Sequence, residues 1–334
     1  MNRFDTLCAR TLLVAIAGLA FSQMALAGDY TNVEFPVIAV NNSGAAIGNA
    51  GMGSVIVWAP NGAITTFTVS HAVSAYPIAI NNLGAIVGWY YDAGAVLHGF
   101  LRDASGTLTV IDAPGAGTLT HSGTVADSVN DTGEVSGHYL DSNGRTHGFV
   151  RDSAGNYSTF TPAGSTYLAD SGLSQNGEAC GWYQDETSFG TGYIRDASGQ
   201  ITTYSVPGSA WTQSVGINAS GQITGIYSPE SGKTQGYVRN ADGSFVTFQL
   251  PGGTVFPTVI VGIADNGDVV GYYGSEGFHG FVRSAATGVI TTFDDPDADH
   301  VHFDGTFPES VSGNETIGGN FSNAVGSGTG FILQ

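Results

Sequence analysis

Residues 80–90 read Ile-Asn-Asn-Leu-Gly-Ala-Ile-Val-Gly-Trp-Tyr, and this stretch carries the pattern that decides the fold. An apolar residue, often followed by Asn, precedes a Gly turn and then an alternating run that ends on Gly-x-aromatic. The pattern recurs at 129–139, 173–183, 217–227 and 263–273, with weaker copies at 40–50 and 311–321. Gly suits a tight hairpin because it adopts positive φ readily. We therefore interpret each copy as two short antiparallel strands.

Two further phrases follow each copy. His-Gly-Phe-x-Arg occurs at 98–102, 147–151 and 279–283, with Tyr variants at 191–195 and 235–239, and Ile-Thr-Thr-Tyr-x-x-Pro closes the unit at 201–207. The turn positions fall at residues 44, 84, 133, 177, 221, 267 and 315, which are 40 to 49 residues apart. Four short strands in a period of this length are typical of one β-propeller blade.

The two ends of the chain predict a closed ring. The seventh copy stops in its third strand at residues 330–334, and residues 30–36 (Tyr-Thr-Asn-Val-Glu-Phe-Pro) align with the fourth-strand phrase at 201–207. We therefore predict an all-β fold, a seven-bladed β-propeller with four-stranded blades. It forms a single domain from 28 to 334, and its N-terminal strand completes the last blade and closes the ring.

These phrases resemble the HAF-type extracellular repeat, a bacterial family named for a His-Ala-Phe motif. The motif here is His-Gly-Phe, and the first copy carries Trp58 at a position where Trp is common in the family. The resemblance covers nearly all of residues 28–334. It implies an exported protein built of these repeats, and it implies no particular reaction or ligand.

Residues 1–27 read as a signal peptide. Arg3 and Arg10 precede an apolar run at 11–21 that is too short to span a bilayer as a helix, and Ala25-Leu26-Ala27 is a small-x-small cleavage site. We expect an exported monomer, periplasmic or extracellular, with no membrane span. The remaining chain holds 7 basic and 27 acidic residues, which excludes nucleic-acid binding through phosphates. Its single thiol, Cys180, excludes an internal disulfide.

Repeated cations and imidazoles favour an architectural role. Five of the seven basic residues occupy one repeat position: Arg102, Arg151, Arg195, Arg239 and Arg283. We expect each to contact a nearby acid or a carbonyl at the blade end, the alternative being a ring that grips an anion. His98, His147 and His279 begin third strands in different blades, so packing explains them better than catalysis or a shared metal.

Four aromatic residues are the candidate ligand-binding set: Trp89, Tyr90, Trp182 and Tyr183. Their rings could stack on sugars, and the alternative is that they fill the gaps between blades. The innermost strands carry small residues, with acids beside them in a few blades. Asp127, Asp170 and Glu309 are therefore the candidate catalytic residues at the channel mouth, one acting as acid and another as base.

The stretch 294–305 is the candidate metal site. Its alternating acids resemble the opening of a calcium loop, but the Gly and the final Glu of the helix-loop-helix motif are missing. A transition metal held by the two histidines is the second option, and a solvated connection is the third. The residues concerned are Asp295, Asp297, Asp299, His300, His302 and Asp304. No cofactor is expected other than calcium or another divalent metal.

Two functions fit these observations. The first is an exported, non-enzymatic binding or surface-interaction module, whose ligand would be a polysaccharide, a cation or a protein. The alternative is a secreted or periplasmic enzyme, a hydrolase or lyase acting on a polysaccharide, with acids at the channel mouth. The sequence has no nucleophile elbow, phosphate-binding loop or paired-Cys motif that would favour another chemistry.

Overall fold

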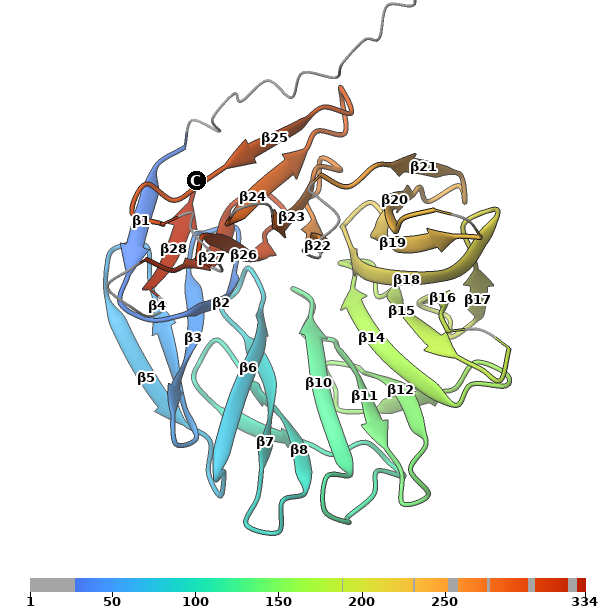
Figure 1. The fold of residues 1–334 in the computed structure, drawn as a ribbon. Helices are drawn as coiled ribbons and strands as arrows, with labels where there is room; N and C mark the ends of the chain where they lie inside the picture. The colour runs from blue at the N-terminus through green and yellow to red at the C-terminus, as the bar shows by residue number, and fades with distance from the viewer. Residues whose placement is uncertain are drawn as a thin grey trace, which may run out of the picture.

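The computed structural model describes residues 28–187, 189–230, 232–251, 258–274, 277–299, 304–323 and 329–334. Within these ranges the chain forms 28 β-strands and no helix, which confirms the all-β class. It follows that no helix of this part of the chain could cross a membrane. The predicted signal peptide lies outside the described residues. The sheets follow one another around a central axis (Figure 1).

Five sheets have four strands, and one eight-stranded sheet consists of two sets of four, β6–β9 and β10–β13. We treat each set of four as a sheet and name its strands from the axis outward. The innermost strands are β2 (Val37–Val40), β6 (Ser74–Ile80), β10 (Gly123–Val129), β14 (Tyr167–Leu173), β18 (Ser209–Ile217), β22 (Thr258–Ile263) and β26 (Thr306–Val311). The second strands are β3 (Ala46–Gly51), β7 (Ile86–Tyr91), β11 (Val135–Leu140), β15 (Ala179–Gln184), β19 (Ile223–Pro229), β23 (Val269–Gly274) and β27 (Ile317–Phe321). The third strands are β4 (Ser54–Trp58), β8 (Leu97–Arg102), β12 (Thr146–Arg151), β16 (Thr191–Arg195), β20 (Gln235–Arg239), β24 (Phe278–Arg283) and β28 (Thr329–Leu333). The outermost strands are β5 (Ile64–Thr68), β9 (Leu108–Ile111), β13 (Tyr157–Phe160), β17 (Ile201–Tyr204), β21 (Phe245–Phe248), β25 (Ile290–Phe293) and β1 (Tyr30–Val33).

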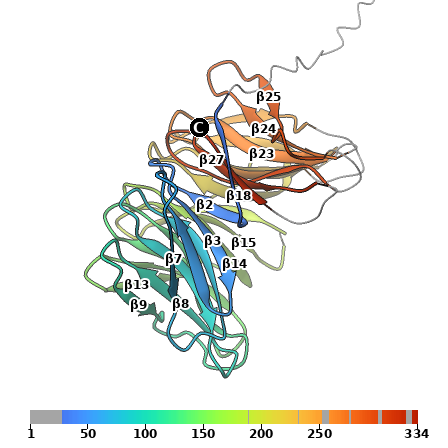
Figure 2. The ribbon, with the colours of Figure 1, turned by 90° about the vertical axis from the view of Figure 1, so that its left-hand side faces the viewer.

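The N-terminal strand joins the C-terminal sheet. β1 pairs antiparallel with β28, from Tyr30 opposite Leu333 to Val33 opposite Gly330. Figures 1 and 2 show this blue strand alongside the red strands of the β26 sheet. Elsewhere each sheet follows the chain order, and the β6 and β10 sheets are also linked by one parallel pair, Leu97 with Gly123. The alignment of residues 30–36 with a fourth strand therefore agrees with the observed pairing.

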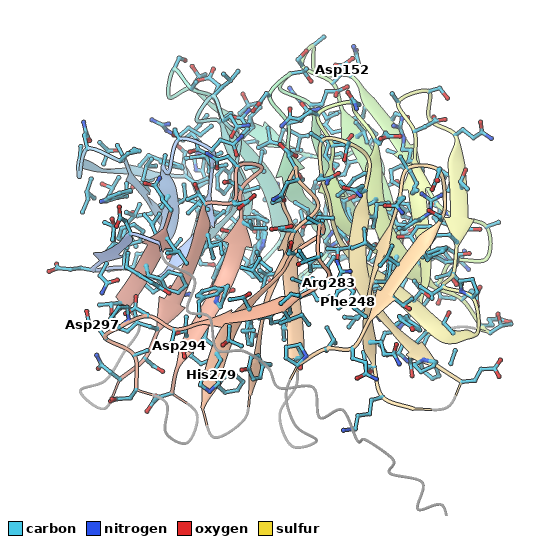
Figure 3. All side chains as sticks on the ribbon, turned by 90° about the horizontal axis from the view of Figure 1, so that it is seen from above. Asp152, Phe248, His279, Arg283, Asp294 and Asp297 are labelled. Atoms are coloured by element: carbon cyan, nitrogen blue, oxygen red, sulfur yellow. The ribbon has the colours of Figure 1, made fainter. Side chains whose placement is uncertain are left out.

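The chain alternates between two faces of the molecule. We call the side that holds the first-to-second and third-to-fourth strand turns the turn face. The other side holds the second-to-third hairpins and the connections between sheets, and we call it the loop face. Figure 3 shows Asp152 on the turn face and Asp294, Asp297 and His279 on the loop face.

The recurring Asn of the first phrase holds the turn face together. Asn81 Oδ1 accepts hydrogen bonds from the amides of Leu83 and Ala85 in its own turn, while its Nδ2 donates to the Asn130 carbonyl of the next sheet at 2.8 Å. Asn41, Asn130 and Asn218 repeat the bond to the following sheet. The side chain thus caps a turn and ties two sheets together, which is why the repeat selects it.

The Gly-Phe-x-Arg phrase builds the interior between sheets. Phe149 is fully buried, and the glycine before it, Gly148, leaves room for the Phe160 ring of the fourth strand. A Cβ at Gly148 would collide with that ring. The same arrangement of glycine and ring recurs at Gly192 and Tyr204. Close packing across the third and fourth strands therefore requires a glycine here.

The repeated arginines lie over aromatic rings, a contact that sequence reasoning missed. Four guanidinium groups stand on the fourth-strand ring of the preceding sheet: Arg102 on Phe67, Arg195 on Phe160, Arg239 on Tyr204 and Arg283 on Phe248, at 4.6 to 5.7 Å. In the β6 sheet the corresponding residue is Ile111, and Arg151 instead faces Tyr157 of its own sheet at 5.9 Å. Arg151, Arg195 and Arg239 also donate to the next residue's carbonyl, as expected. These cations are therefore architectural.

Candidate functional site

The central channel consists of two hollows. Seven aliphatic side chains contribute to the walls of both hollows and separate them: Val40, Ile80, Val129, Leu173, Ile217, Ile263 and Val311. The turn-face hollow is lined by the Asn turns and encloses about 180 Å³, whereas the loop-face hollow encloses about 330 Å³. The loop-face hollow is lined by two of the predicted catalytic acids, Asp127 and Glu309, so the candidate site lies at that end.

A β-bulge in every innermost strand supplies that lining. At one repeat position of every innermost strand a residue is skipped in the pairing with the second strand. The seven residues skipped at this position all line the loop-face hollow: Ile38, Ile78, Asp127, Ser171, Val215, Val261 and Glu309. A bulge redirects a side chain out of the regular alternation of a strand. The bulges therefore bring two predicted catalytic carboxylates, Asp127 and Glu309, into one hollow.

Asp127 is fixed by an imidazole that the sequence analysis did not single out. His138 on β11 lies 2.7 Å from Asp127 Oδ2 through its Nδ1 atom. Burial opposes protonation of His138, but the charge and hydrogen bond of Asp127, with the charge of Asp170, outweigh it and raise its pKa. The contact with Asp127 therefore favours the protonated form of His138.

Asp170, the third predicted acid, lies behind this pair between the β10 and β14 sheets. Its Oδ2 accepts a hydrogen bond from Ser136 Oγ at 2.7 Å, and Tyr193 approaches its Oδ1 at 3.5 Å. Burial and the charge of Asp127 raise the pKa of Asp170 well above its usual range. Asp170 does not line the hollow, so it acts on the site through Asp127 and His138.

These polar residues depart from the repeat. Where Asp170 stands, the other sheets have Val37, Pro77, Ala126, Ser214, Ile260 and Pro308. Where His138 stands, the two neighbouring sheets have Trp89 and Trp182. The sequence could have indicated this site, because His138 replaces the Trp that neighbouring copies carry between Gly and Tyr. A charged cluster is costly between sheets that elsewhere pack apolar atoms, so its presence marks a functional candidate.

Aromatic side chains flank the cluster on the loop face. Trp89 stacks on Tyr76 at 4.3 Å between ring centroids, and Trp182 packs against Tyr167 at 5.4 Å. Tyr76 and Tyr167 are 39% and 41% exposed. We call this set the loop-face arc, and its members are Tyr76, Trp89, Asp127, His138, Tyr167 and Trp182.

Two of the predicted ligand-binding residues belong to the core. Tyr90 and Tyr183 are buried, because consecutive residues of a strand point to opposite sides and only one of each Trp-Tyr pair can face the arc. This corrects the expectation that the Tyr rings are available on the rim. Trp89 and Trp182 keep a partly exposed position.

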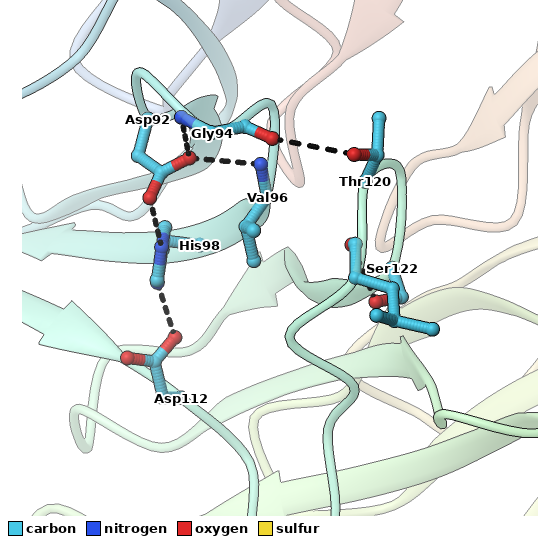
Figure 4. Close-up of polar contacts among 8 residues, drawn as sticks. Asp92, Gly94, Val96, His98, Asp112, Thr120 and Ser122 are labelled. Carbon is cyan, nitrogen blue, oxygen red and sulfur yellow. Dashed lines mark hydrogen bonds and ion pairs between the residues drawn. The ribbon is translucent and has the colours of Figure 1, made fainter.

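The repeated histidines join neighbouring loops of the loop face. His98 stacks on Tyr90 at 5.1 Å, and its two ring nitrogens approach Asp112 at 2.8 Å and Asp92 at 3.7 Å (Figure 4). His147 stacks on Tyr139 in the same way. Asp92 also accepts the amides of Gly94 and Val96, which closes the hairpin. These contacts agree with a packing role.

The predicted metal stretch is dispersed. Asp297 accepts a hydrogen bond from Asn32 at 2.8 Å, and the carboxyl of Asp295 is turned inward and buried. The Asp299 amide donates to the Ser322 carbonyl, and the Asp304 carbonyl accepts from the Phe278 amide. His300 and His302 lie outside the described residues. Within the described ranges, no three His, Cys, Asp or Glu side chains come close enough together to hold a metal ion.

Comparison with solved structures identifies the class of fold. A streptogramin B lyase structure is 14% identical, with 92% of this chain and 98% of that chain covered and a TM-score of 0.58. The β-propeller domain of the Trilobed protease from Pyrococcus furiosus is 10% identical, with 92% and 96% covered and a TM-score of 0.58. Identities this low show the fold alone, which is a β-propeller.

The protease propeller has an open velcro topology, whereas β1 pairs with β28 here. No protein-family model matches this chain, and no curated protein matches it.

Proposed function

We propose that this chain is an exported binding module that takes a carbohydrate ligand on the loop-face arc. The observation that carries the proposal is the arc itself, in which the contacting pair Asp127 and His138 lies between sheets that each carry a partly exposed Trp side chain. Flat aromatic rings suit the apolar faces of sugars, and adjacent polar groups can bond their hydroxyls. The residues of the arc come from three neighbouring sheets, those of β6, β10 and β14, as expected for one site.

Exposed apolar side chains on the same face support a binding role. Met52, Val73, Leu119 and Phe189 are 93%, 62%, 62% and 78% exposed, and all four stand in hairpins or connections of the loop face. Exposed apolar side chains are common at interaction surfaces, although the turn face exposes Leu83 and Val289 as well. A ligand that spans several sheets would cover these side chains as well as the arc.

We also infer that the propeller has seven blades and that β1 closes it. The seven sets of four strands, two of which share one parallel pair, and the pairing of β1 with β28 support this inference. Deleting residues 29–36 would remove one strand and the buried side chains of Val33 and Phe35, at a cost of several kcal/mol. Thermal unfolding measures the loss, and an unchanged melting temperature would show that the ring does not depend on β1.

Trp89→Ala tests the binding proposal. We expect at least a tenfold loss of affinity for the best oligosaccharide on a glycan array, followed by calorimetry, because the largest apolar surface of the arc is removed. Leu83→Ala, an exposed truncation on the turn face, is the matched control and should bind as the parent does. Equal affinities for both variants would place the ligand elsewhere, and silence of the parent on every glycan would refute the carbohydrate assignment.

A second candidate is an enzyme that acts on a polysaccharide, favoured by one observation. Asp127, His138 and Asp170 come together at one junction between sheets, where the environment raises the pKa values of His138 and Asp170. General acid and base catalysis uses such pairs of groups with separated pKa values. Asp127→Asn distinguishes the two functions, because it would abolish turnover by an enzyme and would weaken a binding module only in part.

A further inference from the structure

A second group of aromatic side chains lies on the loop face, at the junction of the β22 and β26 sheets. The rings of Phe278 and Phe307 are 4.8 Å apart between centroids, and Tyr272 packs edge-on against them at 6.0 and 5.6 Å. All three side chains are partly exposed, and each stands in the half of its strand nearer the loop face. The junction therefore presents an aromatic surface on the same face as the loop-face arc.

A carboxyl group and an amide stand beside these rings. Glu309 is the residue skipped at the bulge of β26, and its exposed side chain lines the loop-face hollow. Its Oε1 accepts a hydrogen bond from Asn320 Nδ2 at 3.4 Å. Asn320 lies opposite Phe307 in the pairing of β26 with β27. We call this set the second cluster, and its members are Tyr272, Phe278, Phe307, Glu309 and Asn320.

The second cluster repeats the plan of the arc. Only two of the seven skipped residues are acids, Asp127 in the arc and Glu309 here. Each contacts the residue that its own second strand carries between Gly and an aromatic residue, which is His138 in one sheet and Asn320 in the other. In both cases the preceding sheet carries an aromatic residue at that same repeat position: Trp89 and Tyr272. The other five skipped positions, which lack an acid, do not reproduce this combination.

The arc and the second cluster lie on opposite sides of the channel mouth. The arc belongs to the β6, β10 and β14 sheets, and the second cluster belongs to the β22 and β26 sheets (Figure 1). The β18 sheet separates them on one side and the β2 sheet on the other. Asp127 and Glu309 both line the loop-face hollow, so this hollow is the space between the two groups.

We propose that the second cluster is a further carbohydrate subsite, and that the ligand is a neutral polysaccharide chain which crosses the channel mouth from the arc to this subsite. The inference rests on the proposed function. Partly exposed rings offer surface for the apolar faces of sugars, and Glu309 and Asn320 offer an acceptor and a donor for hydroxyls. Each subsite carries an acid, and residues 28–334 hold 27 acidic and 7 basic residues, so an anionic chain would be repelled.

Two subsites joined by one chain make affinity depend on chain length. A short oligosaccharide occupies only one subsite, whereas a chain that reaches both engages the second one intramolecularly. Such a connection strengthens binding by about 10²–10⁴-fold when the spacing fits. We therefore expect the affinity of the parent protein to rise at least about tenfold between the shortest chains and those that span the mouth.

Calorimetry with ladders of neutral gluco-, xylo- and manno-oligosaccharides, from disaccharide to octasaccharide, tests this expectation. Tyr272→Ala should bind the shortest chains as the parent does and should lose most of the rise with length. Trp89→Ala should weaken binding at every length, because the arc is engaged by short and long chains alike. Val289→Ala truncates an exposed side chain on the turn face of the same sheet, so it is the matched control and should keep the full rise.

Glu309→Ala provides a second variant of the same subsite. Its side chain is exposed, so the variant should fold, and it should also reduce the rise with length. Tyr272→Ala and Glu309→Ala that both keep the parent's full rise overturn the second subsite and leave the arc as the binding site. Equal affinity of the parent for short and long chains overturns it as well. Binding by the parent of charged glycans alone on the array overturns the neutral chain while the carbohydrate proposal stands.

Discussion

The turn face and the loop face are made by the same repeat, and both use carboxyl groups to close turns, since hydrogen bonds within their own hairpins lower the pKa values of Asp92 and Asp141 on the loop face as well. The two faces differ in the acids that are buried. On the turn face, Asp103, Asp152, Asp196 and Asp242 accept hydrogen bonds from their own turns, which lower their pKa values. Toward the loop face, burial raises the pKa values of Asp170, Asp295 and Glu309. Carboxyl groups that accept hydrogen bonds within a turn belong to the repeat. Buried carboxyl groups with raised pKa values lie where one sheet differs from the others.

Asn81→Ala would break the turn face most severely. Its side chain is 5% exposed and serves both its own turn and the next sheet, so we expect a loss of about 3 kcal/mol in the free energy of unfolding. Urea denaturation measures it. Asn82→Ala removes an exposed neighbour and should cost less than about 1 kcal/mol. Equal losses would mean that the buried Asn is not what joins the sheets.

Asp170→Asn tests whether a buried carboxyl group toward the loop face destabilises the fold when it is ionised. A raised folded-state pKa means that the ionised Asp170 destabilises the fold, so stability falls as pH rises from the unfolded-state value through the folded one. The pKa of His138 is also raised, so the stability that protonated His138 contributes is likewise lost as pH rises. The variant should match the parent near pH 4 and exceed it at pH 8, by about 1 kcal/mol or more.

Asp152→Asn provides the comparison for that titration. Its folded-state pKa is lowered, so its contribution is present above the unfolded-state pKa and is lost as pH falls through the folded-state value. Stability curves from pH 3 to 8 should therefore depart from that of the parent in opposite directions as pH rises, with Asp170→Asn more stable and Asp152→Asn less stable than the parent at pH 8. Parallel curves for Asp170→Asn would show that its carboxyl is not buried in the way the contacts indicate.

Glu315→Gly should produce the smallest change in stability, and it tests the one copy of the turn that lacks Gly. Glu315 holds the seventh turn at a φ of 70°, where the other copies have Gly, as at Gly84 with 84°. We expect a gain of about 0.5 kcal/mol from relief of the left-handed conformation, less the loss of its contact with Asn266. Gly84→Ala should lose about 1 kcal/mol. A destabilised Glu315→Gly would show that the side-chain contact outweighs the strain.

Periodicity predicted the fold far better than it predicted the site. The strands, the turn glycines and the pairing of β1 with β28 follow from residues that recur, and recurrence is visible in one sequence. His138 and Tyr76 were missed because their roles depend on which sheets become neighbours. The burial of the Asp295 carboxyl and the contacts of the arginines with aromatic rings depend on how strands pack against one another. The spacing of residues along the sequence does not show this packing.

The bulge in each innermost strand determines which residues can be substituted without disturbing the sheets. A skipped residue takes no part in the ladder, so its side chain can be exchanged without shifting the register of its sheet. The seven skipped residues are therefore separately addressable, and all face one hollow. A library that varies Ile38, Ile78, Val215 and Val261 while keeping Asp127 and Glu309 would explore new linings on an intact scaffold.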